Sequence, residues 1–396
     1  MTEITRYLAP AAIIAASFLG ASAACAEEAD PVDHRNAYAI TRLVSDVAGQ
    51  AAVQDPVLQN AWGVAFTPAG SPFWVNDNVT GCSTLYAGDG TTVPLQVSIP
   101  LPGNVVPTGS CRPVDPKNPS SPTPAAPTGI VWNPSSAFLV PGTKSPAAFI
   151  FATEDGTLSA WAGGLSPAND AVLAVDNSTS PNAANGAVYK ALVVGVNAKG
   201  VFLFATNFRA GTIDVFGPTG PNGLFTAATT DGKFADPEIP AGYAPFGIQN
   251  IDGDLFVTYA QQNAQKHDDV AGVGHGFVDV FDTDGHLLRR FASGGPLNSP
   301  WAVARASYAL GRFSGEILVG NFGDGRINVF DKRGRFIDQL DGPDGKALVI
   351  DGLWTLTLGG GRTSASDTLY FTAGPSGETH GLFGTITPVA DQSEHD

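Results

Sequence analysis

The sequence predicts an all-β fold, a six-bladed β-propeller. A three-part pattern recurs six times along the 396 residues: an opening strand, a continuous apolar strand, and a Gly-led alternating strand that ends in an aromatic residue. Repeats of this length that each supply up to four strands are typical of a propeller, because one unit cannot bury its apolar faces alone. No long segment has a helical period, and the 47 Gly and 30 Pro residues concentrate between the strands, where turns need them.

The opening strands carry the clearest period. They begin 66, 62, 56, 55 and 53 residues apart and are expected at residues 62–66, 128–132, 190–194, 246–250, 301–305 and 354–358. The second strands are uninterrupted apolar runs, which indicate burial on both faces. They are expected at 73–76, 149–152, 202–205, 255–258, 317–320 and 369–372.

Third strands are expected at 84–86, 157–161, 211–216, 276–281, 325–330 and 382–387, and recognisable fourth strands at 95–99, 172–175, 287–291 and 336–340. The sixth unit has no fourth strand of its own. We expect residues 39–44 near the N-terminus to supply it and close the ring, which leaves no open edge. The alternative is that this strand packs only on the outside. One propeller domain at 38–390 follows, with a linker at 27–37 and a polar tail at 391–396.

Composition limits the classes of partner. The formal net charge is −16, 43% of the residues are hydrophobic and 15% are charged, so the chain has the composition of a globular protein with a large core. Because the basic residues form no run or stripe, we expect neither nucleic acid nor an anionic membrane surface as a partner. We expect a monomer that does not insert into a membrane.

The first 26 residues have the pattern of a signal peptide. Arg6 precedes a short apolar run at 8–20, and Ala24–Ala26 fits a cleavage site. The mature protein is therefore expected to be exported, periplasmic or extracellular. Cys25 raises lipidation as an alternative, although Ser22 stands where a lipoprotein signal has a Leu-like residue.

Export leaves two cysteines, Cys82 and Cys111, in an oxidising compartment. Both are expected in loops on one face of the ring, so the sequence predicts one disulfide that pins the Pro-rich insertion at 100–127. The alternative is two unpaired thiols.

Polar residues end the second strands, at the loops expected to surround the mouth of the central channel, where ligands bind in closed β architectures. The candidates for ligand binding are Asn78, Glu154, Asn207, Arg209, Asn321 and Glu378. Four of them, Glu154, Asn207, Asn321 and Glu378, offer oxygen ligands of the kind a divalent cation such as calcium takes. Turn formation explains most Asn and Asp residues equally well, but Glu is a poor turn former.

Histidines and one lysine add further candidates. His267 and His275 fall in the loop after the second strand of blade 4, and His380 falls in the matching loop of blade 6. Converging histidines could hold a metal or act as a general base, and solvated loop residues are the alternative. Lys190 opens its strand where most other blades have an aromatic residue, and there it could pair with Glu154 or hold an anionic ligand. Candidate catalytic residues are thus His267, His380, Glu154 and Lys190.

Long motifs carry a family resemblance, among them NFRAGTIDVF (207–216), KHDDVAGVGHGFVDVFD (266–282) and GNFGDGRINVFD (320–331). They resemble a family of exported bacterial propeller proteins without an assigned activity. More distantly the pattern is similar to NHL-repeat propellers and to gluconolactonase-like hydrolases and streptogramin lyase. The resemblance implies a six-bladed propeller and transfers no catalytic residue.

Two functions follow as hypotheses. The first is an exported binding or interaction module that takes a small molecule or a protein ligand at the channel mouth, because no nucleophile motif is present. The second is a metal-assisted hydrolase or lyase, lactonase-like, with its site at the same mouth. The fold alone is compatible with both.

Overall fold

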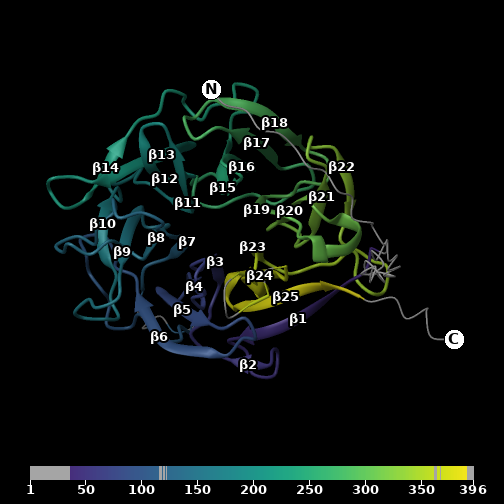
Figure 1. The fold of residues 1–396 in the computed structure, drawn as a ribbon, viewed down its shortest axis with the longest axis horizontal. Helices are drawn as coiled ribbons and strands as arrows, with labels where there is room; N and C mark the ends of the chain where they lie inside the picture. Colours follow the sequence, from purple (N-terminus) through teal and green to yellow (C-terminus); the bar gives the residue numbers. More distant parts are fainter. Residues whose placement is uncertain are drawn as a thin grey trace, which may run out of the picture. The chain divides into compact units, whose positions relative to one another are not determined.

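The computed structural model describes residues 36–389, apart from 116, 117, 119, 120, 122, 361–363 and 366. Six small sheets form a ring (Figure 1). The predicted six-bladed propeller is therefore confirmed. The predicted signal peptide, Cys25 and the C-terminal tail lie outside the described residues.

Each of the first five blades is a four-stranded antiparallel sheet. Blades 1 to 3 comprise β3 (Ala61–Ala65), β4 (Phe73–Asp77), β5 (Cys82–Tyr86), β6 (Thr92–Ser98), β7 (Pro127–Trp132), β8 (Phe149–Thr153), β9 (Thr157–Trp161), β10 (Val172–Asp176), β11 (Tyr189–Asn197), β12 (Gly200–Asn207), β13 (Thr212–Thr219) and β14 (Phe225–Ala228). Blades 4 and 5 comprise β15 (Tyr243–Ile251), β16 (Asp254–Gln261), β17 (Phe277–Phe281), β18 (Leu287–Ser293), β19 (Pro300–Arg305), β20 (Ile317–Asn321), β21 (Ile327–Phe330) and β22 (Phe336–Gln339). The sequence pattern missed β14, a short strand with two exposed residues and so little apolar signal.

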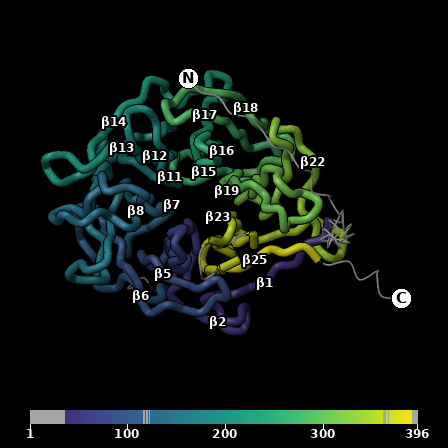
Figure 2. Tube along the Cα trace, in the orientation of Figure 1, coloured from purple at the N-terminus to yellow at the C-terminus, as the bar shows by residue number. Residues whose placement is uncertain are grey.

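Blade 6 contains both ends of the described chain. It combines β23 (Leu353–Leu358), β24 (Leu369–Ala373) and β25 (Leu382–Pro388) with β1 (Tyr38–Ser45) and β2 (Val53–Gln54). β1 pairs antiparallel with β25, from Tyr38 opposite Pro388 to Ser45 opposite Leu382, and the purple and yellow segments run side by side in Figure 2. The N-terminal strand therefore closes the ring, as predicted.

Small residues let the innermost strands approach one another at the centre. The first strands β3, β7, β11, β15, β19 and β23 each contact the first strands of both neighbouring blades. A Cβ atom on Gly63 would lie 2.3 Å from the backbone oxygen of Thr128, and one on Gly129 would lie 2.3 Å from the backbone nitrogen of Leu192. This explains why a glycine follows the first residue of several opening strands.

The predicted disulfide forms between Cys82, the first residue of β5, and Cys111 in the connection from blade 1 to blade 2. Beside the strands, the described chain has a 3₁₀ segment at Tyr308–Phe313 and one helical turn, α1 (Pro375–Glu378). None of the helices in the described residues is long and apolar enough to cross a membrane.

Candidate functional site

An aromatic plug fills the centre of the ring on the side where the second strands end. We define the aromatic plug as Trp62, Phe208, Phe246, Trp301, Phe322 and Trp354. Trp354 stacks on Trp62 with ring centroids 3.5 Å apart and on Phe322 at 4.0 Å. Its indole N–H donates to Asn60 Oδ1 at 2.8 Å. The aromatic residues that open four of the blades therefore pack with Phe208 and Phe322 into one apolar cluster. A layer of polar side chains lies against this cluster.

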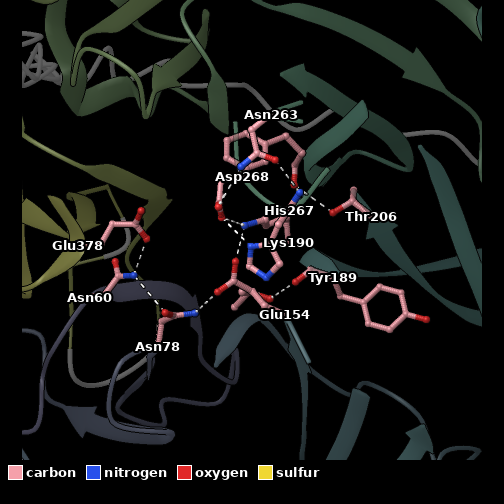
Figure 3. A network of polar contacts seen from close by, with 12 residues as sticks. Asn60, Asn78, Glu154, Tyr189, Lys190, Thr206, Asn263, His267, Asp268 and Glu378 are labelled. Atoms are coloured by element: carbon pink, nitrogen blue, oxygen red, sulfur yellow. Dashed lines mark hydrogen bonds and ion pairs between the residues drawn. The ribbon is translucent and has the colours of Figure 1, made fainter. Parts of the chain in front are cut away.

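We call that layer the mouth network, and its members are Asn60, Asn78, Glu154, Lys190, Asn263, His267, Asp268 and Glu378 (Figure 3). They come from blades 1, 2, 3, 4 and 6. Most stand in loops at strand ends; Lys190 is the second residue of β11, and Glu378 is the last residue of α1. The ring closure thus brings together residues that lie more than 300 positions apart in the chain.

Lys190 is the centre of the network. Its side chain is only 3% exposed, and its ammonium forms ion pairs with Glu154 and, at 3.5 Å, with Asp268. The ammonium also lies 5.4 Å from the ring centroid of Trp62 and 5.8 Å from that of Phe208, which adds cation–π attraction. Burial alone would lower the pKa of Lys190, but the neighbouring carboxylates outweigh it and raise this pKa above its ordinary value. The buried lysine is therefore charged.

Glu154 is fixed on both sides of its carboxylate. One oxygen accepts from Lys190, and the other accepts from Asn78 Nδ2 at 3.0 Å. The Asn78 side-chain oxygen in turn accepts from Asn60 Nδ2 at 3.3 Å. A chain of hydrogen bonds thus links the loops of blades 1 and 2 across the mouth.

Blade 4 supplies a histidine–aspartate pair. His267 Nδ1 lies 2.7 Å from Asp268 Oδ1, and Asn263 Nδ2 donates to the other Asp268 oxygen at 3.2 Å. The hydrogen bond from His267, together with the charge of Lys190, lowers the pKa of Asp268 to about 2 despite partial burial. The Asp268 side chain is 60% exposed and that of His267 is 36% exposed, so solvent or a ligand reaches both.

Blade 6 holds Glu378 in an unusual conformation. Asn60 Nδ2 donates to Glu378 Oε2 at 2.8 Å. Both residues have positive φ angles, 49° for Asn60 and 66° for Glu378, and Ser376 and Gly377 are left-handed as well. A left-handed Glu costs on the order of 1 kcal/mol, and such strain gathers at binding and active sites. Burial, with added repulsion from Glu154, raises the pKa of Glu378 to about 7.

Carboxylates outnumber cations at the mouth. Beside Glu154, Asp268 and Glu378, the half-buried Asp155 and Asp269 interact electrostatically with the network, and burial raises the pKa of each. The nearby basic groups in these interactions are Lys190 and His267. The mouth is therefore negative in sum, although the Lys190 ammonium balances one of its carboxylates.

The structure separates the other predicted site residues from this network. Asn207 donates to Asp214 at 3.0 Å within blade 3, and Asn321 donates to Asp324 at 3.0 Å within blade 5. The guanidinium of Arg209 donates to the backbone oxygen of Gly186 at 3.0 Å.

The three loop histidines have separate partners. His267 is paired with Asp268, His275 Nδ1 lies 3.0 Å from the backbone oxygen of Val270, and His380 Nδ1 lies 2.9 Å from Asp46 Oδ2. Among the described residues, one group of three acidic, histidine or cysteine side chains has the spacing of metal ligands. His267 is the one histidine in that group. In the described part of the chain, His267, His275 and His380 therefore do not converge on one metal site, and the alternative of separate loop residues fits them better.

That group is Glu154, His267 and Asp268, whose ligand atoms all lie within 4.8 Å of one another. Lys190 already forms ion pairs with both carboxylates of the group. A divalent cation among them would face a buried ammonium at short range, where like charges repel strongly. The residues therefore do not fit a divalent cation while Lys190 is charged.

Asn60 and Asp268 were not among the site residues predicted from the sequence. Asn60 lies two residues before Trp62 and looks like an ordinary turn residue, and Asp268 lies beside His267 in a polar loop. The adjacency of His267 and Asp268 was the available signal for the second. Nothing local marks Asn60, because its partner Glu378 comes from the far end of the chain.

Comparison with known proteins gives relatives without assigned activity. No protein-family profile matches the chain. It is 31% identical over 353 residues to the uncharacterised protein R648 of Acanthamoeba polyphaga mimivirus, covering 88% of this chain and 80% of that one. It is also 31% identical over 369 residues to the uncharacterised mimivirus protein L690, covering 92% and 89%.

Solved structures with a similar fold include a gluconolactonase from Xanthomonas campestris, with a TM-score of 0.44 and 14% identity over 84% of this chain and 88% of that one. A streptogramin B lyase structure has a TM-score of 0.46 and 13% identity over 89% and 98%. These likenesses concern the fold alone. The sequence relatives are viral, so a bacterial and exported family remains a prediction. The chain belongs to the same protein family as R648 and L690 of Acanthamoeba polyphaga mimivirus.

Proposed function

We propose that this chain is a ligand-binding propeller whose mouth network recognises a positively charged group, an ammonium or a guanidinium. The observation that carries the proposal is the buried Lys190 ammonium held by Glu154 and Asp268. The network is thus already built to hold an ammonium, and the carboxylates around Lys190 outnumber it.

The groups that a ligand would reach are those nearer the solvent. Asp268 and His267 are accessible, and the partly exposed Asp269 and Glu378 are carboxyl groups whose pKa values burial raises. A cationic group would relieve the repulsion among these carboxylates, because each carboxylate is favoured in its ionised form by a nearby positive charge. The net charge of −16 would also speed the approach of a cation at low ionic strength.

The cationic group could belong to a free polyamine or to a basic side chain of a protein, and calorimetry distinguishes the two sources. Spermidine represents the first, and a short Lys/Arg-rich peptide the second, with a norleucine-rich peptide of the same length as the uncharged control. We expect tight binding of one cationic probe and none of the control.

Matched variants locate the binding. Asp268→Asn is expected to weaken it at least about tenfold, which corresponds to the loss of one charge-assisted contact. Asp344→Asn, which removes the same charge in an exposed blade 5 turn, should leave it unchanged. Equal binding of the neutral peptide, or equal effects of the two variants, would overturn the proposal.

A second candidate is favoured by two oriented acid–base side chains in the mouth network, Glu378 bound by Asn60 and His267 paired with Asp268. A carboxyl group with a pKa of about 7 can donate a proton at neutral pH, and the Asp268-oriented His267 can accept one. This supports a hydrolase or lyase that needs no metal. Turnover of a lactone and ester panel in the presence of a chelator, lost in both Glu378→Gln and His267→Gln, would establish it; a panel without turnover would reject it.

We also propose that the protein is exported. The disulfide between Cys82 and Cys111 supports an oxidising compartment. The mature protein is then expected to begin at Glu27, which intact-mass measurement of the protein recovered from its host would test. A full-length mass with free thiols would contradict export.

A further inference from the structure

We propose a second binding site that takes an apolar carboxylate. It shares no lining residue with the mouth network and differs from it in chemistry. It is a pocket of about 460 Å³ at the seam where the chain closes the ring. We call it the seam pocket, and the residues that decide its chemistry are Arg42, Val349, Phe371, Ser376, His380 and Leu382. They come from β1, from the connection between blades 5 and 6, and from β24, α1 and β25. The volume falls in the range of small-molecule sites.

Arg42 gives the seam pocket an available positive charge. Its Nη1 donates to Gln50 Oε1 at 3.1 Å. Within the described residues it forms no ion pair with a carboxylate, although acidic residues greatly outnumber basic ones in this chain. A guanidinium has five N–H donors in a planar fork that matches a carboxylate, so several donors remain for a ligand.

His380 is the second polar side chain that lines the seam pocket, and its orientation is fixed. The Asp46 carboxylate, only 6% exposed, lies 2.9 Å from His380 Nδ1 through one oxygen and accepts from the Gly381 backbone N–H at 2.8 Å through the other. A carboxylate bound to Nδ1 fixes the orientation of the imidazole and leaves Nε2 as the ring nitrogen available to a ligand. The acidic group that also lines the pocket, Asp351, accepts from the Ser376 backbone N–H at 2.8 Å.

Apart from Ser45, the rest of the lining is apolar. Phe371 and Ile350 are fully or almost fully buried, Leu382 is partly buried, and Val349 is 54% exposed. Burying an apolar tail against these side chains would contribute about 25 cal/mol per Å² of apolar area removed from water. The pocket therefore combines the Arg42 guanidinium and the His380 imidazole with an apolar surface, which suits a molecule with one carboxylate and a short aliphatic or aromatic body.

A ligand here would act on ring closure. Residues of the N-terminal strand β1 and of the C-terminal strands β24 and β25 line the seam pocket. β1 and β25 pair along the seam (Figure 1). A molecule that contacts both binds the closed ring only, so it stabilises the native state in proportion to its occupancy.

Octanoate is the probe, with octanol and octylamine as controls that keep the tail and change the head group. Octanoate is expected to bind by calorimetry and to raise the melting temperature, whereas the two controls are not. Arg42→Gln should weaken octanoate binding at least about tenfold. Arg335→Gln, an equal loss of charge at an exposed turn of blade 5, should not change it.

Further variants keep the test decisive. Arg42 is exposed, so its replacement should not impair folding, and His380→Gln provides an independent reading of the same head-group contact. Asp268→Asn, a mouth variant, is expected to leave octanoate binding unchanged, so failure of this proposal is distinguishable from failure of the mouth proposal. Octanol binding as tightly as octanoate, an unaffected Arg42→Gln, or no octanoate binding at millimolar concentration would overturn the seam pocket proposal.

Discussion

Lys190 stands where a metal ion would otherwise balance the mouth carboxylates. The sequence predicts Lys190 at the mouth with Glu154 as a possible partner, and this ion pair forms. It could not foresee the second partner, because Asp268 reaches Lys190 only when blade 4 is folded beside blade 3. The Lys190 ammonium occupies the place between Glu154 and Asp268 that a calcium ion would take, and this distinguishes the site from the calcium site expected from Glu154, Asn207, Asn321 and Glu378.

Replacing Lys190 by Met should create a divalent-cation site. The carboxylates of Glu154 and Asp268 and the imidazole of His267 would then lack a cation at ligand spacing. We expect the metal-free Lys190→Met protein to lose about 3 to 5 kcal/mol of stability, the usual cost of removing one partner of a buried ion pair. Calcium or zinc should restore part of it, as measured by denaturant unfolding with and without metal.

The control is the double variant Lys190→Met, Asp268→Asn, which removes one ligand and should not respond to metal. Stoichiometric metal in the purified wild-type protein would contradict this account of Lys190.

Glu378 should make stability depend on pH. Its pKa is raised in the folded state to about 7, from an ordinary value of 4.5. A carboxyl group with a raised folded pKa binds its proton more tightly when folded, so stability falls as the pH rises from about 4.5 to about 7. Glu378→Gln imitates the protonated form. It should match the wild type near pH 4 and be more stable at pH 8, by up to about 3 kcal/mol.

Denaturant unfolding at the two pH values measures the difference. Asp268→Asn is a useful contrast, because the pKa of Asp268 is lowered and its charge stabilises the folded state above that pKa. A Glu378→Gln protein that is less stable than the wild type at pH 8 would contradict the prediction that the charged Glu378 carboxylate destabilises the folded state.

At the scale of elements, the connection from blade 1 to blade 2 depends on one covalent bond. The disulfide closes a loop across 29 positions between Cys82 and Cys111. Hydrogen bonds add to it: Gln59 exchanges two with the backbone of Val114, at 2.8 and 3.1 Å, and the Cys111 N–H donates to the Thr80 backbone oxygen at 3.0 Å. The pairing was predictable from cysteine number and strand order. The path of the insertion between the two blades was not predictable, because the insertion has no periodic pattern of its own.

Removing this disulfide should destabilise the protein by about 3 kcal/mol, the chain-entropy value for a loop of this size. The double variant Cys82→Ser, Cys111→Ser should show the loss in denaturant unfolding, and a reducing agent should have no further effect on it. The wild type under the same reducing agent should approach the double variant. Equal stability of reduced and oxidised wild type would mean that the insertion is held by its other contacts.

At the scale of the whole molecule, β1 makes the ring a closed structure. Tyr38 is fully buried, and its hydroxyl donates to the backbone oxygen of Leu310 in blade 5 at 2.9 Å while its strand pairs with β25 in blade 6. Without β1, the edge of β25 would expose unpaired backbone groups, which promote association between chains.

A chain lacking residues 1–45 is therefore expected to aggregate and to lose at least about 5 kcal/mol, the apolar burial of Tyr38, Leu43 and Val44. A chain lacking only residues 1–35 is the control and should remain folded. Size-exclusion chromatography and thermal unfolding compare the two. If the shorter chain stays monomeric and melts like the control, β1 is dispensable for closure.

The sequence by itself determined the class and number of the blades, the closing strand and the disulfide. These properties follow from local patterns, because alternation, apolar runs and turn residues report burial within a single blade. It also marked Glu154, Lys190 and Glu378 as exceptions to the repeat. Only the tertiary structure decided which exceptions meet: Asn60 with Glu378, Lys190 with Asp268, and His380 with Asp46. Each of these pairs joins different blades or the two ends of the chain, and a local pattern carries no information about a partner that ring closure brings into contact.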